Sequence, residues 1–205
     1  MNKKELLDSL REKGFSKAIL DAFSNVNRED FMPGNVKAMA YEDTALPIGH
    51  GQTISQPYTI AIMLSLLDLK QGQKVLEIGS GCGYVLALLS EIVGENGKVY
   101  GMEVVKELAE KSKENLADYG NVRVYNKNGA LGLPEKAPFD GILISAAIRE
   151  IPEKLMDQLK VGGIIVAPKG SRFEQEIIAI QRKSKTEFEI KKKIPGFIFV
   201  PFVEY

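Results

Sequence analysis

From Lys74 to Ala167 the chain alternates between short apolar runs and longer amphipathic segments, and this alternation restricts the fold more than any other feature. The apolar runs have the length of buried strands, and the segments between them have helical spacing. We expect strands over residues 75–78, 98–102, 122–125, 139–145 and 164–167, and helices over residues 84–93, 105–119 and 152–159. Strands that alternate with helices form a largely parallel sheet covered by helices. The sequence therefore predicts a doubly wound α/β fold.

The N-terminal part departs from this rhythm. Leu6, Leu7 and Leu10 recur at helical spacing, and Ser16 is placed to cap a second helix. Between Met32 and Pro57 prolines and glycines interrupt any long element, and a helix then follows to Leu67. A loop-rich stretch of this length in a compact domain is more often functional than idle.

The C-terminal part is predicted to form a β-hairpin over residues 176–182 and 188–193, followed by a final strand over residues 197–203. No internal repeat or low-complexity linker divides the chain. We therefore expect a single domain over residues 1–205. Residues 1–73 would supply the N-terminal helices and the loop-rich segment, and residues 74–205 a cofactor-binding α/β core with its hairpin.

Composition excludes several functional classes. Lys+Arg and Asp+Glu both number 27, whereas proteins that bind nucleic-acid phosphates usually have a basic excess. Cys82 is the single cysteine and His50 the single histidine, so the chain offers neither an internal disulfide nor a metal-ligand cluster. No apolar run approaches the roughly 20 residues that span a membrane, and the start does not resemble a signal peptide. We expect a cytoplasmic monomer without nucleic-acid, membrane or metal partners.

The loop Gly79-Ser80-Gly81-Cys82-Gly83 joins an apolar strand to a helix. Glycines permit a tight turn there and let backbone N–H groups approach a ligand. Glu103 lies 103 − 83 = 20 residues beyond the last glycine, at the end of the next strand. An acid at this spacing accepts the ribose hydroxyls of an adenosine, although it can also simply face the positive end of a helix. The pattern predicts an adenosine-bearing cofactor.

Two features favour S-adenosylmethionine over NAD as that cofactor. The third glycine comes one residue earlier than in the dinucleotide fingerprint. Glu77, two residues before the loop, would repel a pyrophosphate but suits an ammonium or sulfonium group. The alternative for Glu77 is a structural acid satisfied by backbone donors.

Two longer runs are similar to a known family. Leu46–Pro57, with its core Gly51-Gln52-Thr53-Ile54-Ser55, and Val75–Tyr84 resemble the signatures of protein-L-isoaspartate O-methyltransferases. Further similar segments are Asp140–Ala147, Ile151–Glu153, Leu159–Gly163 and Phe199–Phe202. The similarity covers nearly the whole chain, and the Gly-Gln-Thr-Ile-Ser run is its most specific part.

The resemblance implies a Rossmann-like S-adenosylmethionine-dependent methyltransferase with a mostly parallel seven-stranded sheet. It also implies a repair reaction, in which the α-carboxylate of L-isoaspartyl residues in damaged proteins and peptides is methylated. The ester then recloses to a succinimide, which can open to normal aspartate.

The resemblance also assigns site residues. Ser55 would orient the substrate carboxylate, which is ionised at neutral pH because its pKa is near ~4, so no general base is required. Substrate would contact Thr53 and Ile54 beside Ser55, and also Ala146, which ends the fourth expected strand of the α/β core, where ligands of open α/β sheets bind. Cofactor would contact Glu77, Gly79, Ser80, Gly81, Gly83, Glu103, Asn128 and Gly129. The structural alternatives are a helix N-cap for Ser55, loop hydrogen bonding for Thr53 and helix packing for Ala146.

One departure from the family pattern leaves other functions open. The family has Gly-Asp-Gly after its third strand, where this chain has Lys127-Asn128-Gly129. The Asn128 amide oxygen can still accept a hydrogen bond, but the negative charge is lost. The alternatives are a methyltransferase of the same fold with a small-molecule acceptor, and a non-catalytic cofactor-binding module that recognises modified proteins. An NAD-dependent oxidoreductase is disfavoured by the glycine spacing and by Glu77.

Overall fold

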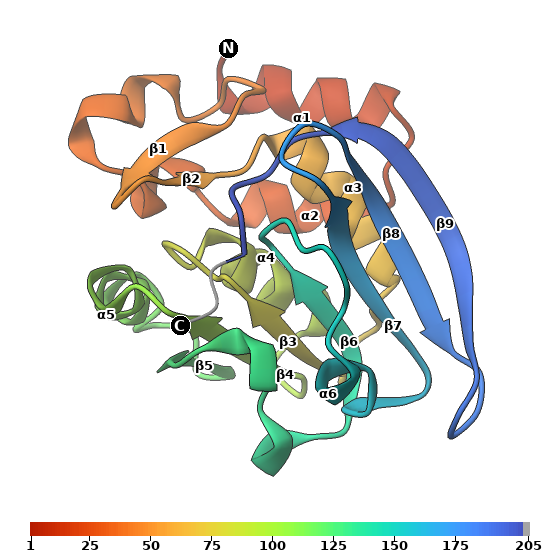
Figure 1. Ribbon diagram of the computed structural model, residues 1–205. Coiled ribbons are helices and arrows are strands. Elements are labelled where there is room, and N and C mark those ends of the chain that lie inside the picture. The colour runs from red at the N-terminus through yellow and green to blue at the C-terminus, as the bar shows by residue number, and fades with distance from the viewer. Residues whose placement is uncertain (203–205) are drawn as a thin grey trace.

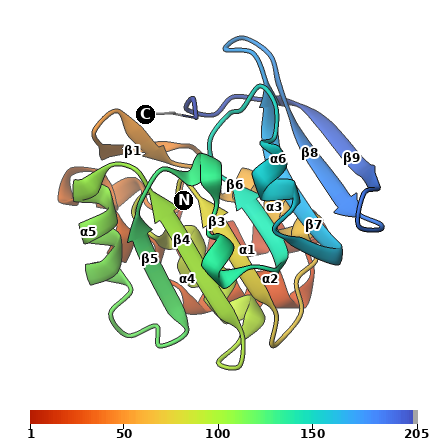
Figure 2. The same ribbon diagram turned by 60° about the horizontal axis from the view of Figure 1, so that its bottom comes forward.

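The computed structural model describes residues 1–202, and its centre is a seven-stranded sheet (Figure 1). Its strands are β3 (Lys74–Ile78), β4 (Lys98–Glu103), β5 (Val122–Asn126), β6 (Phe139–Ile144), β7 (Leu159–Gly170), β8 (Gln175–Arg182) and β9 (Phe188–Phe197). They lie in the order β5-β4-β3-β6-β7-β8-β9, which Figure 2 shows across the molecule. The first five are parallel, and β8 and β9 are antiparallel. The predicted mostly parallel α/β fold with a C-terminal hairpin is confirmed.

Successive residues of the central strands point to opposite faces of the sheet. Val75 and Leu143 belong to one core cluster, and Leu76 and Ile142 to the other. The first cluster is covered by α1 (Lys3–Glu12), α2 (Lys17–Asn25), α3 (Pro57–Leu67), α4 (Tyr84–Val93) and α5 (Lys106–Asn115). The second is covered by α6 (Glu153–Met156) and by Leu133, which lies between the short 3₁₀ turns η3 (Gly129–Leu131) and η4 (Pro134–Lys136). Within residues 1–202 no helix is both long and apolar enough to cross a membrane.

The loop-rich segment before α3 contains two 3₁₀ turns and a small hairpin. The turns are η1 (Arg28–Phe31) and η2 (Gly34–Met39), and the hairpin pairs β1 (Leu46–Gly49) with β2 (Gln52–Ile54). His50 and Gly51 connect the two strands with φ angles of 53° and 70°, as a two-residue hairpin turn requires. Ile48 packs against the glycine loop, where a Cβ built on Gly81 would lie 3.1 Å from its Cδ1. The hairpin therefore covers the carboxyl end of β3.

Two predicted helices are shorter than expected. α5 ends at Asn115 and not at Tyr119, because the chain turns through Gly120 to enter β5. α6 stops at Met156, because β7 begins at Leu159, before the expected strand start at Ile164. Ser16 does cap α2, as predicted.

The predicted final strand is wrong over the described residues 198–202. β9 ends at Phe197, and the chain then leaves the sheet. It meets the loop after β6 instead, where Ala147 N–H donates to the Val200 carbonyl at 2.8 Å and Phe202 N–H donates to the Ala147 carbonyl at 2.8 Å. Pro201 lies between these bonds and has no N–H for a strand ladder. Val203, the last residue of the predicted strand, is outside the described residues.

Candidate active site

Three hollows meet beside the carboxyl ends of β3, β4 and β6. The Glu103 cavity (≈ 140 Å³) includes Glu103, Gly79, Gly81, Gly129 and Ala146 among its lining residues. The Glu77 cavity (≈ 40 Å³) includes Glu77, Ser145, Ile54 and Ser55. The C-terminal cleft (≈ 130 Å³) runs between Ser55 and the segment Gly196–Val200. Thr53 lines all three, so the hollows adjoin one another.

The glycine loop adopts a conformation that requires its glycines. Gly79, Gly81 and Gly83 have φ angles of 79°, 52° and 89°, in the left-handed region that other residues avoid. A Cβ on Gly83 would lie 2.5 Å from Ser112 Oγ, so the start of α4 could not approach α5. Ser80 in the same loop is buried, and its hydroxyl has no hydrogen-bond partner in the part of the chain that the structure describes.

Glu103 is 5% exposed and ties the glycine loop to the next helix. Its Oε2 accepts from Gly81 N–H at 2.8 Å, and its Oε1 accepts from Val105 N–H, at the start of α5, at 2.9 Å. Glu103 therefore does face the start of a helix, which was the structural alternative to its predicted role in cofactor binding. A carboxylate oxygen accepts more than one hydrogen bond, so both oxygens can still accept from a ligand in the Glu103 cavity.

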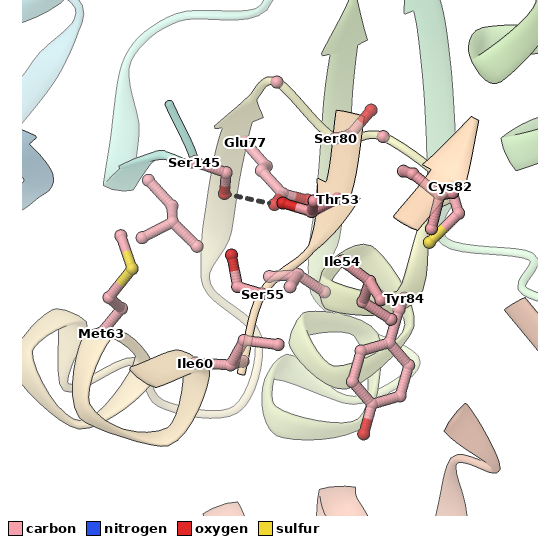
Figure 3. A pocket seen from close by; sticks show the side chains of 15 residues that line it. Thr53, Ile54, Ser55, Ile60, Met63, Glu77, Ser80, Cys82, Tyr84 and Ser145 are labelled. Atoms are coloured by element: carbon pink, nitrogen blue, oxygen red, sulfur yellow. Dashed lines mark hydrogen bonds between the residues drawn. The ribbon is translucent and has the colours of Figure 1, made fainter. Parts of the chain in front are cut away.

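Glu77 is 1% exposed, and backbone donors do not satisfy it. Ser145 Oγ donates to its Oε1 at 2.7 Å (Figure 3), and Oε2 has no partner among residues 1–202. Burial raises the pKa of Glu77 to about 8, with the Ser145 hydrogen bond opposing the shift and the charge of Glu103 adding to it. The structural alternative for Glu77 is thus wrong. A buried carboxylate with an unpaired oxygen beside a cavity is suited to a cationic ligand group.

Ser55 does not cap α3. The N-cap position is Gln56, and the cap comes from Asp43, whose Oδ1 accepts from Tyr58 N–H at 2.9 Å and whose Oδ2 accepts from Gln56 Nε2 at 3.1 Å. The N-cap alternative for Ser55 is therefore wrong, and within residues 1–202 its hydroxyl has no hydrogen-bond partner. Figure 3 shows this hydroxyl pointing from the start of α3 toward the side of the cavity where Glu77 and Ser145 lie.

The remaining predicted residues divide into two groups. Thr53, Ile54, Ala146 and Gly129 line the hollows, and a Cβ on Gly129 would lie 2.1 Å from Ile78 Cγ2. Asn128 does not line the Glu103 cavity, and its Oδ1 accepts from Ala130 N–H at 2.9 Å as the cap of η3. The structure therefore brings together every predicted site residue except Asn128 and Gly83, and Gly83 faces Ser112 and lines none of the three hollows.

Sequence reasoning missed Ser145, Asp43 and the segment 196–200. Ser145 ends a strand that we predicted, so its position at the carboxyl edge of the sheet was a usable signal. No local pattern connects Asp43 with Tyr58 or Gly196 with Ser55. Among residues 1–202, no three His, Cys, Asp or Glu side chains are grouped to hold a metal ion.

Tyr84 and Cys82 also lie in the wall of the Glu77 cavity. Tyr84 is 2% exposed, its ring packs edge-on against Phe23 and Phe31, and its hydroxyl points away from the cavity (Figure 3). Cys82 is 4% exposed, and burial raises the pKa of its thiol to about 11. Tyr84 therefore belongs to the core, and Cys82 remains a neutral thiol near pH 7.

Comparison with known proteins places this site in a family. The model of the protein-L-isoaspartate (D-aspartate) O-methyltransferase family matches residues 1–205. Protein-L-isoaspartate O-methyltransferases of Methanothrix thermoacetophila and Ignicoccus hospitalis are 44% and 43% identical, over 99% and 98% of this chain and 95% and 97% of theirs. A solved protein-L-isoaspartate O-methyltransferase superposes with a TM-score of 0.90 at 31% identity, over 98% of this chain and 65% of that one. A Plasmodium falciparum structure assigned to the same activity, in complex with S-adenosyl-L-homocysteine, gives a TM-score of 0.82 at 27% identity, over 99% of both chains. This chain belongs to the protein-L-isoaspartate (D-aspartate) O-methyltransferase family.

Proposed function

We propose that this chain transfers the methyl group of S-adenosylmethionine to the α-carboxylate of L-isoaspartyl residues in damaged proteins and peptides, and that Ser55 orients that carboxylate. The observation that carries the proposal is the Ser55 hydroxyl. It has no partner within residues 1–202, and it lies where the Glu77 cavity meets the C-terminal cleft. A donor at such a junction can bind an acceptor group that enters from the cleft.

The residues of the two cavities fit S-adenosylmethionine. Glu103 would accept the ribose hydroxyls, and the backbone N–H groups of the glycine loop would face the methionyl part. The unpaired oxygen of Glu77 would face the ammonium group. With this oppositely charged group and Ser145, both oxygens of the buried carboxylate would then have a hydrogen-bond partner. When bound, this cofactor supplies an electrophilic methyl group on a sulfonium.

The protein's task is to orient the acceptor and to exclude water. The α-carboxylate is a nucleophile without deprotonation at neutral pH, since its reference pKa is below about 4. Ser55 Oγ–H would donate to one carboxylate oxygen and leave the other free to attack in line. Ile48 and Ile54, both buried, cover the reacting region with apolar side chains and keep water from competing. None of these steps requires a general base.

We further propose that the chain is one methyltransferase domain. Residues 1–73 supply the N-terminal helices and the loop with Ser55, and residues 74–205 supply the cofactor-binding core and, through the segment 196–200, the other wall of the acceptor cleft. Asn128 would then contribute through the loop that it caps. A monomer in the cytoplasm remains our prediction from the sequence. Size-exclusion chromatography with light scattering would test the oligomeric state.

The function is tested with methyl-labelled S-adenosylmethionine and two peptides that differ in one residue, isoaspartyl in one and aspartyl in the other. We expect base-labile label on the isoaspartyl peptide alone. Label on neither peptide, with S-adenosylhomocysteine still bound, would contradict the proposed acceptor and redirect the search to small molecules or to a non-catalytic role. Equal labelling of both peptides would contradict recognition of the isoaspartyl linkage.

A further inference from the structure

The segment Gly196–Val200 forms one side of the C-terminal cleft, and Ser55 lies on the other side. This segment is at the very end of the sheet. The pairing of β9 with β8 stops at Phe197, which faces Gln175. Beyond that point the β8–β9 ladder no longer fixes the backbone, so the shape of the cleft depends on other contacts.

The Gln175 side chain supplies such a contact. It is 4% exposed, and its Oε1 accepts from Phe199 N–H at 2.7 Å. Its Nε2 donates to the Ser171 carbonyl at 3.1 Å and lies 3.5 Å from the Phe199 carbonyl. A carboxamide carries an acceptor and two donors, as a peptide group does. Gln175 therefore takes the place of a strand partner for Phe199.

The next contact along the segment is made by backbone alone. Ala147 exchanges hydrogen bonds of 2.8 Å with Val200 and Phe202, and these do not depend on the Ala147 side chain. Residues 200–202, at and just beyond the end of this segment, reach the Glu103 cavity and are thus held independently of Gln175. Gln175 lines neither of the two cavities. Loss of its carboxamide would loosen the wall of the cleft and leave the cofactor side in place.

We propose that Gln175 is a positioning residue that sets the shape of the C-terminal cleft through the Phe199 backbone, and thereby the affinity for the isoaspartyl peptide. The inference rests on the proposed function, because it requires the acceptor peptide to lie in this cleft. In this proposal a residue of β8 sets the affinity for the acceptor peptide but does not change the affinity for the cofactor, although β8 touches none of the reacting groups.

The test is Gln175→Met, which keeps the length and volume of the side chain and removes its hydrogen bonds. We expect KM for an isoaspartyl hexapeptide to rise about tenfold, with kcat and the Kd of S-adenosylhomocysteine each within about twofold. The matched control is Gln181→Met on the same strand, where Nε2 donates to the Gly162 carbonyl at 3.0 Å, at the opposite end of β8. Its KM should stay at the wild-type value.

The melting temperature of each variant guards against a trivial loss of folding. Gln175→Glu retains an acceptor for Phe199 N–H but turns a carboxylate oxygen toward the Ser171 carbonyl, so its KM should be at least as high as that of Gln175→Met. An unchanged KM in Gln175→Met would overturn the inference, as would a parallel loss of peptide and cofactor binding, which indicates a purely structural role. A wild-type chain that methylates no isoaspartyl peptide would overturn the proposed function itself, a result visible before any variant is made.

Discussion

The two sides of the site are built in different ways. On the cofactor side, Glu77 lies within β3 and Glu103 ends β4, two adjacent parallel strands whose ladder fixes both carboxylates. On the acceptor side, Ser55 and the segment 196–200 come from distant parts of the chain. The start of α3, directly after Ser55, is capped by the single side chain of Asp43, and Phe199 in the middle of the segment is bound by the single side chain of Gln175 on β8.

This difference separates binding of the cofactor from orientation of the acceptor. A ladder of backbone hydrogen bonds tolerates most side-chain changes, whereas a contact made by one side chain is lost with that side chain. We therefore expect variants of the acceptor side to change peptide kinetics while S-adenosylhomocysteine binding persists. Variants of the cofactor side should do the reverse.

The largest effect is expected for Ser55→Ala. Without the hydroxyl the acceptor carboxylate loses its orienting donor, and kcat should fall by about 100-fold, because small misplacements of a nucleophile cost this much. The Kd of S-adenosylhomocysteine, measured by calorimetry, should stay within about twofold. If Ser55→Ala lowers kcat and cofactor affinity by the same factor, Ser55 does not act on the acceptor alone, and the proposed separation of the two sides is wrong.

Glu103→Ala is the corresponding change on the cofactor side. It removes an acceptor for the ribose and also leaves Gly81 N–H and Val105 N–H without their carboxylate. Cofactor affinity should fall by about 30-fold, in the range of lost hydrogen bonds to charged groups. At saturating cofactor, KM for the isoaspartyl peptide should be close to wild type. A peptide KM that rises as much as the cofactor Kd would show that the two sides are coupled.

The same difference explains what the sequence could predict. Glu103 could be found from its spacing, because the carboxyl ends of parallel strands meet at one edge of the sheet. The contacts from Asp43 to Tyr58 and from Gln175 to Phe199 follow no periodicity, so no local pattern indicates them. The prediction for residues 198–202 was wrong for the same reason. Their partner, Ala147, is about fifty residues away in the sequence. The apolar composition of residues 198–202 does not show whether they pair along a whole strand or through one isolated β-bridge.

A smaller effect, on pH dependence, is expected from Glu77. Its pKa of about 8 lies above the ordinary value of 4.5, so the folded protein holds a proton that the unfolded chain releases. Stability of the cofactor-free protein should therefore fall as pH rises from about 4.5 toward 8. A cationic ligand group favours the ionised carboxylate, so binding releases a proton below pH 8 and affinity grows with pH. Calorimetry with S-adenosylhomocysteine should give about tenfold tighter binding near pH 8.5 than near pH 6.5.

Glu77→Gln is the control for this pH dependence, since it keeps an acceptor for Ser145 and cannot ionise. Its S-adenosylhomocysteine affinity should change little between the two pH values, and its melting temperature should lose the decline toward pH 8. A wild-type affinity that is flat over this range would mean that Glu77 does not face the ammonium group.

The smallest effect is expected for Asp43→Ala, which tests whether the acceptor side depends on single side chains. The variant loses the cap of α3, which contributes about 1 kcal/mol, so the melting temperature should fall by roughly 2–4 °C. Because the cap lies directly after Ser55, kcat should also fall by about fivefold while cofactor affinity is kept. Asp43→Asn retains an acceptor for Tyr58 N–H and should recover most of both losses. If Asp43→Ala lowers the melting temperature but keeps the full kcat, the position of Ser55 is fixed by the β1–β2 hairpin that precedes it. The acceptor side would then depend on backbone hydrogen bonds, as the cofactor side does.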